Sequence, residues 1–107
     1  MAFYELRQYT IKPGKMAEWI TLMEGEIIPF QVAQGMVITG SFRGEEDDSV
    51  YIWMRRFQSE EERKALYVAV YESEYWKNVV SPQVAELIDR EKNHITRIVP
   101  TEKSTTQ

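Results

Sequence analysis

Three side chains that could do chemistry together, Glu5, Arg7 and Tyr9, alternate along one short segment near the N-terminus. Successive residues of a β-strand point to opposite faces, so a strand over residues 3–10 would place all three on one face. An arginine there can bind a carboxylate or enolate oxygen, a glutamate can move a proton, and a tyrosine can donate a hydrogen bond. The pattern indicates a polar site, with Glu5 and Arg7 as catalytic candidates and Tyr9 as a ligand-binding candidate.

The same residues also fit a purely structural interpretation. Glu5 and Arg7 could form an ion-pair network with Arg55 or with a second subunit, because buried ion pairs are often only architectural. The sequence leaves both interpretations open.

A second segment, residues 50–57, contributes three ligand-binding candidates: Tyr51, Trp53 and Arg55. Arg55 would stabilise oxyanion character in a ligand, together with an arginine of the first strand. Tyr51 and Trp53 would form an aromatic wall against a flat ligand. Alternatively they would form the core of a dimer interface, where aromatic side chains are common.

His94 is the only histidine in the chain. Its unperturbed pKa lies near neutrality, which makes it a third catalytic candidate, as a general base. A strand over residues 92–99 would place His94 with Thr96 and Ile98 on one face, and either face of that strand could line the site. A single histidine is also common as a surface or structural residue.

Length and composition narrow the classes of function. The chain has 107 residues, which is one domain, and we place its boundaries at 1–100 with a disordered polar tail over 101–107. A net charge of −4 without a basic stripe argues against nucleic acid, and no apolar run is long enough for a membrane span. The absence of cysteine excludes disulfides and thiolate metal sites. We expect a cytoplasmic protein without a signal peptide.

No cofactor or metal is expected either. The sequence has no Gly-rich phosphate loop, no zinc-ligand spacing and no nucleophile elbow. The acidic run Glu45 to Asp48 lacks the spacing of a calcium loop, so it is interpreted as a solvated hairpin tip.

The periodicity of apolar residues, together with Pro and Gly positions, divides the chain into its elements. They are a strand over residues 3–10, a helix over 14–33, strands over 36–43 and 50–57, helical segments between 59 and 88, and a strand over 92–99. Pro29 predicts a kink or break in the first helix, and Gly40 a bulge in the second strand. Ser59 and Glu62 form a capping box.

This order predicts an α+β, ferredoxin-like fold, with a four-stranded antiparallel sheet and its helices on one face. Five aromatic residues would then share the uncovered face: Phe3, Tyr9, Tyr51, Trp53 and Phe57. An uncovered aromatic face implies a partner or a ligand. The simplest partner is a second copy packed face to face.

Several motifs occur in an order that resembles NIPSNAP-family domains, within the dimeric α+β barrel superfamily. They are YELRQYTIKPGK at residues 4–15, Gly35, GSF at 40–42, YIWMRRF at 51–57, Arg63 and Trp76. The resemblance spans roughly residues 3–99. It implies a ferredoxin-like unit that dimerises by packing two sheets into a barrel. Related barrel families include cofactor-independent monooxygenases, isomerases and heme-degrading enzymes.

The resulting hypothesis is a homodimer that binds a small, oxygenated or anionic metabolite in the barrel lumen. As an enzyme it would be a cofactor-independent monooxygenase or a proton-transfer enzyme, with His94 or Glu5 as the base. The alternative is a non-catalytic module whose dimer core is packed shut. Heme degradation is disfavoured, because those enzymes ligate heme through a helix-borne histidine and His94 lies on a predicted strand.

Overall fold

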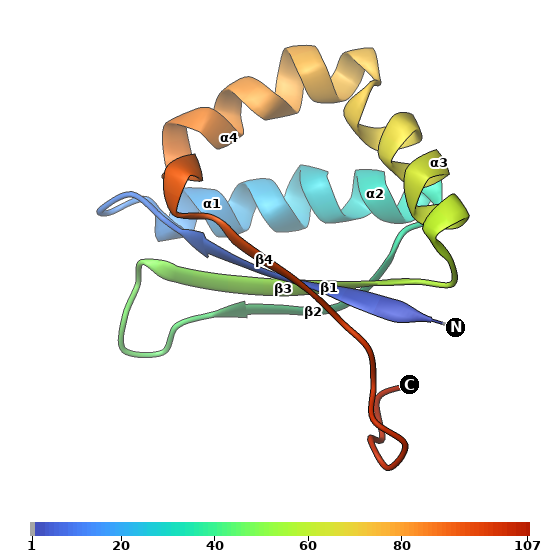
Figure 1. Ribbon diagram of the computed structural model, residues 1–107. Coiled ribbons are helices and arrows are strands. Elements are labelled where there is room, and N and C mark those ends of the chain that lie inside the picture. Colours follow the sequence, from blue (N-terminus) through green and yellow to red (C-terminus); the bar gives the residue numbers. More distant parts are fainter. Residues whose placement is uncertain (1) are drawn as a thin grey trace.

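A four-stranded antiparallel sheet forms the base of the protein in the computed structural model, which describes residues 2–107 (Figure 1). Met1, which the predicted domain 1–100 includes, lies outside the described residues. The strands are β1 (Phe3–Thr10), β2 (Val37–Arg43), β3 (Val50–Phe57) and β4 (His94–Ile98), in the order β2-β3-β1-β4. The predicted α+β ferredoxin-like fold is confirmed, with β1 between β3 and β4.

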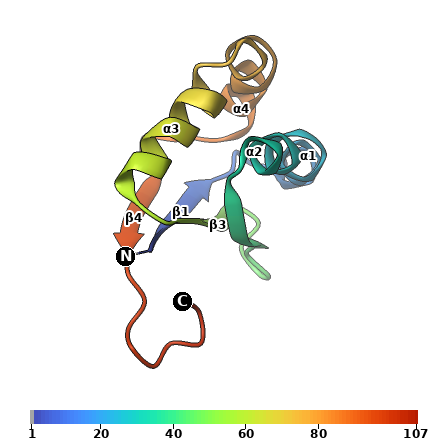
Figure 2. The same cartoon turned by 90° about the vertical axis from the view of Figure 1, so that its right-hand side faces the viewer.

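The helices all lie on one side of this sheet (Figures 1 and 2). The first helical rod consists of α1 (Met16–Leu22), the π-helical turn η1 (Met23–Ile27) and α2 (Ile28–Gln34). The second region consists of α3 (Glu60–Tyr71), the π-helical turn η2 (Trp76–Val80), α4 (Ser81–Leu87) and the 3-10 turn η3 (Arg90–Lys92). No helix within residues 2–107 is long and apolar enough to cross a membrane.

Both prolines within the helices follow a π-helical turn. The ring of Pro29 would clash with the carbonyl group four residues earlier, that of Gly25 in an α-helix. Gly25 lies in η1, and the wider turn accommodates the proline without ending the rod. Pro82 follows η2 in the same way. The predicted interruption at Pro29 therefore takes the form of a π-helical turn.

Local signals in the sequence set the ends of the other elements. The Ser59 hydroxyl accepts a hydrogen bond from the Glu62 amide at 3.1 Å, so the predicted N-cap of α3 is confirmed. The Glu62 carboxylate accepts a hydrogen bond from the Gln58 amide at 3.0 Å, whereas a capping box would pair it with the Ser59 amide. The register between β2 and β3 shifts between Ile38 and Gly40, which confirms the bulge.

The aromatic face of the sheet is covered by the helices, so the prediction that it is bare is wrong. Tyr9 packs against Trp19 of α1, with ring centroids 5.8 Å apart, and Trp19 also packs against Tyr51 at 5.6 Å. Glu5 lies opposite Arg55, and Arg7 opposite Trp53, so these polar candidates share the covered face. Strand alternation predicts which residues share a face, but it does not predict which face the helices cover.

The opposite, uncovered face carries a different set of apolar residues. Val37 and Phe42 of β2 are about half exposed, and Ile98 of β4 is 37% exposed. Phe42 lies opposite Ile52 of β3, which is partly buried. The uncovered face therefore exposes apolar side chains among polar ones such as Gln8 and His94, and it is not the aromatic face that the sequence suggested.

The C-terminal tail, residues 101–107, forms defined turns in the structure, whereas composition alone predicts disorder. The Ser104 amide donates to the Thr101 carbonyl at 3.0 Å, and the Arg56 Nε donates to the Gln107 carbonyl oxygen at 3.1 Å. The tail folds back on the uncovered side of the sheet (Figure 1). It lines a small depression there with Tyr4, which is buried.

Gly35 ends the first helical rod with a backbone φ of 110°, a conformation that favours glycine. We expect Gly35→Ala to lower the free energy of unfolding by about 1–2 kcal/mol, because a Cβ atom is strained at this φ. Gly25→Ala is the matched control, since beyond its chain neighbours and its own helical backbone no atom within residues 2–107 lies within 4 Å of the added Cβ. That change should raise stability by about 0.5 kcal/mol. Urea unfolding measures both, and equal effects would contradict the argument.

Candidate functional site

Glu5 is the centre of a polar cluster between the sheet and the helices. It is 6% exposed, and its Oε1 accepts a hydrogen bond from Arg55 Nη2 at 2.8 Å. The Tyr67 hydroxyl lies 2.8 and 2.7 Å from its two carboxylate oxygens. We call Glu5, Arg7, Arg55, Tyr67 and Tyr71 the Glu5 cluster. Two of its members come from α3, so the helix completes a site that the strands begin.

Arg55 is fully buried and ties the cluster to both helical regions. Its Nη1 donates to Gln31 Oε1 on α2 at 2.9 Å and to the Tyr71 hydroxyl on α3 at 2.7 Å. Its Nη2 donates to the Tyr67 hydroxyl at 2.9 Å as well as to Glu5. The Glu5–Arg55 pair that the structural interpretation required is therefore present within one chain.

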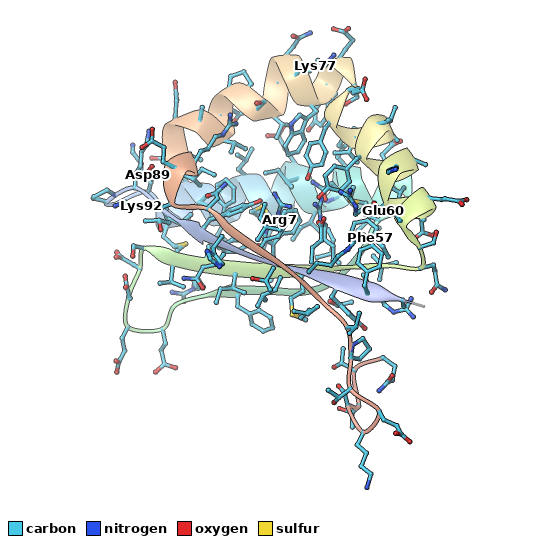
Figure 3. All side chains as sticks on the ribbon, viewed as in Figure 1. Arg7, Phe57, Glu60, Lys77, Asp89 and Lys92 are labelled. Atoms are coloured by element: carbon cyan, nitrogen blue, oxygen red, sulfur yellow. The ribbon has the colours of Figure 1, made fainter. Side chains whose placement is uncertain are left out.

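Arg7 is held less completely than Arg55. Its Nε donates to the Tyr9 hydroxyl at 2.9 Å, but its Nη1 lies 3.5 Å from Glu5 Oε1 and 3.3 Å from the Tyr67 hydroxyl. The Arg7 side chain is 12% exposed, and Figure 3 shows it on the helix side of the sheet. Arg7 is thus the member of the cluster whose charge is the least neutralised by its neighbours.

The electrostatic environment keeps Glu5 ionised and Tyr67 protonated. Burial by itself would raise the pKa of Glu5, but the hydrogen bond from Tyr67 and the nearby charges of Arg55 and Arg7 together lower it. Burial raises the pKa of Tyr67 to about 12, and its hydrogen bond to the Glu5 carboxylate acts in the same direction. At neutral pH the cluster therefore contains a carboxylate acceptor beside a phenol donor.

A small cavity of about 30 Å³ adjoins the cluster between the sheet and the helices. We call it the indole chamber. Its walls are Tyr9, Trp19, Met23, Ile27, Trp53, Tyr71, Trp76 and Val84. A space of this size holds one or two water molecules or a single ligand oxygen, but not a whole metabolite.

The structure groups some of the predicted site residues and separates others. Glu5, Arg7, Tyr9, Trp53 and Arg55 lie together beneath the helices, as the contacts above show. Tyr51 is fully buried behind them, and its hydroxyl pairs with the Ser41 hydroxyl at 2.6 Å.

His94 does not belong to this group. It lies opposite Gln8 on the uncovered face and is exposed, whereas Glu5 and Arg7 point to the helices. The prediction that His94 could serve as the base of this site is therefore wrong, because His94 lies on the other face of the sheet. The residues of β4 on the helix side are Ile95 and Arg97.

Three residues of the site were missed in the sequence: Gln31, Tyr67 and Tyr71. Tyr67 and Tyr71 are four residues apart on one helix face, with ring centroids 5.0 Å apart, which was an available signal. Gln31 follows Ile27 by four residues and so interrupts an apolar stripe. A polar residue on a buried stripe indicates a buried hydrogen-bond partner.

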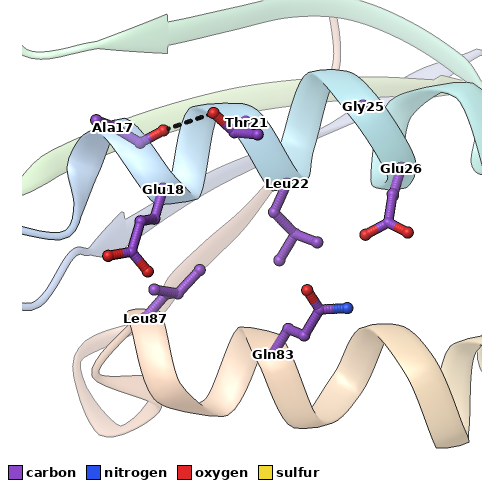
Figure 4. A pocket seen from close by; sticks show the side chains of 8 residues that line it. All are labelled: Ala17, Glu18, Thr21, Leu22, Gly25, Glu26, Gln83 and Leu87. Carbon is purple, nitrogen blue, oxygen red and sulfur yellow. Dashed lines mark hydrogen bonds between the residues drawn. The ribbon is translucent and has the colours of Figure 1, made fainter.

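A broad depression on the surface lies away from the Glu5 cluster. It is a groove of about 480 Å³ between α1, η1 and α4 (Figure 4). Leu22 and Leu87 form apolar parts of its wall, and Glu18 and Glu26 are acidic residues along it. None of the cluster residues lines this groove, so its size does not make it the site of the candidate chemistry. Within residues 2–107, no three metal-binding His, Cys, Asp or Glu side chains lie together.

The sheet order, the one-sided helical layer and the polar cluster beneath it define a ferredoxin-like α+β protein. Residues 4–103 match the NIPSNAP family model, and the chain belongs to the NIPSNAP family. The comparison with curated proteins gives no match.

Solved structures agree with this assignment. A NIPSNAP family protein from Agrobacterium tumefaciens is 27% identical, with a TM-score of 0.87 and 100% of each chain covered. A second protein from that organism, a NIPSNAP family protein of unknown function, is 21% identical, with a TM-score of 0.88 over 99% of this chain and 94% of the other.

A more distant structure shares the fold alone. It is described as a proposed antibiotic biosynthesis monooxygenase from Nitrosomonas europaea. It is 9% identical, with a TM-score of 0.72 over 96% of this chain and 93% of the other.

Removing the charge of Glu5 tests the buried ion pair. Glu5→Gln keeps the side-chain volume but leaves the fully buried Arg55 without its counterion. We expect the free energy of unfolding to fall by about 3 kcal/mol or more at pH 7. Glu61→Gln is the control, because Glu61 is exposed on α3, and it should change stability by less than about 0.5 kcal/mol.

The stability difference between the parent and Glu5→Gln is also predicted to depend on pH. A folded-state pKa below the unfolded value means that Glu5 stabilises the fold above the unfolded pKa, about 4.3, and that this contribution is lost as the pH falls through the lower folded value. The stability difference between the parent and Glu5→Gln should therefore shrink on acidification below about pH 4. Urea unfolding from pH 7 to 3 measures it, and a constant difference would contradict the lowered pKa.

Proposed function

We propose that this chain binds a small, partly apolar, oxygenated anion beneath its helices and removes a proton from it. Proton transfer alone would give an isomerase-like enzyme. Reaction of the resulting carbanion with dioxygen would give a cofactor-independent monooxygenase. Both reactions begin with the same deprotonation, so one binding site serves either outcome.

The observation that carries this proposal is the charge balance of the Glu5 cluster. One buried carboxylate, Glu5, faces two guanidinium groups, Arg55 and Arg7. Arg63 also lies 3.7 Å from Glu5, but it pairs more closely with Glu60 at 2.8 Å. The cluster therefore holds one positive charge in excess, and a buried charge favours an ionic partner. An anionic ligand at Arg7 supplies that partner.

Each cluster residue has a role in the proposed chemistry. Arg7 binds the anionic group of the ligand through charge-assisted hydrogen bonds. Glu5 accepts the proton, and its lowered pKa makes it a weak base. It can therefore deprotonate only a carbon already acidified by a neighbouring carbonyl group. The phenol of Tyr67, which stays protonated at neutral pH, stabilises the negative charge on Glu5 or on the ligand.

One observation favours the alternative, a non-catalytic module with a packed interior. Glu5 and Arg55 satisfy each other through short hydrogen bonds, and the adjoining chamber is only about 30 Å³. A ligand would have to enter past the partly exposed Arg7 side chain and displace helix residues. Ligand binding therefore decides between the two functions.

Truncation of Arg7 distinguishes them. We expect the parent to bind small carboxylates or quinones, as seen by calorimetry or by a rise in Tm. Arg7→Ala should lose at least tenfold in affinity, because the charge-assisted contact is lost. Its stability should change little, because Glu5 keeps Arg55 and Tyr67.

Arg43→Ala is the matched control, because Arg43 is an exposed arginine on the same sheet. It should bind ligands as the parent does. If Arg7→Ala instead loses several kcal/mol of stability and no compound binds the parent, the cluster is structural and the proposal is rejected.

We also propose that the chain forms a homodimer through the uncovered sheet face. Val37, Phe42 and Ile98 expose apolar surface there, and the partly buried Leu6 and Ile52 extend it. A second copy would remove this surface from water. Its face would carry the same residues, as a two-fold interface requires.

Sedimentation at micromolar concentration tests the dimer. Phe42→Asp places a charge in the proposed interface and should shift the protein to monomer. Val68→Asp changes an equally exposed residue on α3, 55% against 56% for Phe42, and should leave the dimer intact. A parent protein that sediments as a stable monomer would contradict the proposal.

A further inference from the structure

The groove between the first helical rod and α4 combines an apolar floor with two acidic side chains. Glu18, Leu22 and Glu26 point from the rod into it, with the leucine between the two carboxylates along the chain (Figure 4). Leu87 points into the same groove from α4. Its volume of about 480 Å³ lies in the range of small-molecule sites, so the groove is large enough for a ligand.

The π-helical turn η1 brings the two carboxylates onto one side of the rod. In a regular α-helix two turns take about seven residues, so side chains eight residues apart diverge. A π-helical turn closes its hydrogen bonds over one residue more, and such turns are frequent at functional sites. Glu18 lies in α1 and Glu26 in η1, and both therefore face the groove. Two turns of the rod separate them by about 11 Å along its axis.

Neither carboxylate has a buried counterion. Glu26 is partly buried, accepts a hydrogen bond from the Tyr75 hydroxyl at 3.3 Å, and forms no ion pair within residues 2–107. Glu18 pairs with Lys15 at 3.3 Å, but both side chains are well exposed, and such pairs contribute little in water. The chain's net charge of −4 adds a long-range attraction for cations. The charge of the groove therefore favours a cationic ligand.

The other polar side chains of the groove bond to their own helices. The Thr21 hydroxyl donates to the Ala17 carbonyl at 3.0 Å, and Gln83 Nε2 donates to the Val79 carbonyl at 2.7 Å. Helical walls also present no strand edge to the main chain of an extended peptide. A chain of methylene groups with a cation at each end needs only what the groove provides, which is apolar surface between two carboxylates.

We propose that this groove binds a linear aliphatic polyamine, with one ammonium group on Glu18 and another on Glu26. The methylene chain lies over Leu22 and Leu87, and the nearer ammonium replaces Lys15 as the partner of Glu18. The site is separate from the Glu5 cluster, so this inference does not depend on the proposed function.

Diamines of different length test the site. In calorimetry at low salt, the parent should bind 1,8-diaminooctane, whose extended chain is about as long as two helical turns. It should bind 1,4-diaminobutane and octylamine about tenfold more weakly, because neither can place an ammonium on both carboxylates. Glu26→Gln should reduce the affinity for 1,8-diaminooctane to that for octylamine. Glu18→Gln should weaken binding less, because Glu18 is the more exposed of the two.

Glu24→Gln is the matched control. Glu24 is an exposed glutamate of the same π-helical turn, but it does not line the groove. This variant should bind 1,8-diaminooctane as the parent does. Arg7→Ala should also bind it normally, which separates this site from the proposed anion site. Circular dichroism checks that each variant is folded.

Three results would overturn the proposal. If Glu24→Gln weakens binding as much as Glu26→Gln, or if affinity does not depend on diamine length, the amines follow net charge alone. If the amines do not bind but a helical peptide with lysines seven residues apart does, and Glu26→Gln abolishes that binding, the groove takes a basic protein segment. If neither binds, the groove has no cationic ligand, and the proposed function is unaffected.

Discussion

The ion pair between Glu5 and Arg55 is the interaction on which the rest of the structure depends. The two residues face each other across β1 and β3, and Arg55 has no exposed surface. Burial of a guanidinium costs less when its charge is paired and its donors are hydrogen-bonded. Gln31 from the first helical rod and Tyr71 from α3 both accept hydrogen bonds from its Nη1, whereas its Nε has no partner within residues 2–107. The pair thus fixes the register of β1 against β3, because a shift by one residue would turn one partner to the other face of the sheet. Through the contacts with Gln31 and Tyr71 it also positions both helical regions over the sheet.

The sequence predicted the elements and the fold well because their signals are local. Alternation placed the strands over residues 3–10 and 50–57 as the structure has them, and the cap at Ser59 set the start of α3. It could not predict which face the helices cover. Both faces of β1 and β3 carry apolar residues, such as Leu6 and Ile52 on one and Phe57 on the other. Three polar residues on the aromatic face suggested an open surface, whereas the helices supply their partners.

The candidate site was only half predictable for a related reason. Its strand residues follow from alternation, but its helix residues follow from how the rods lie across the sheet. The π-helical turns before Pro29 and Pro82 alter the phase of the helices, so a regular 3.6-residue period does not carry through them. Gln31 lies just beyond the first turn. A polar residue on that stripe indicates a buried partner, but that the partner is Arg55 follows only from how the helix lies across the sheet.

The cluster divides into two ends with opposite character. Around Arg55 and Glu5 the hydrogen bonds are short, and every contact comes from a group that is itself buried or partly buried. Around Arg7 the contact with Glu5 lengthens to 3.5 Å and solvent reaches the side chain. A site needs a rigid part that holds its geometry and an under-satisfied part that gains from a ligand. Here one network supplies both, because Arg55 and Glu5 pair closely at 2.8 Å while Arg7 keeps the longer contact with Glu5.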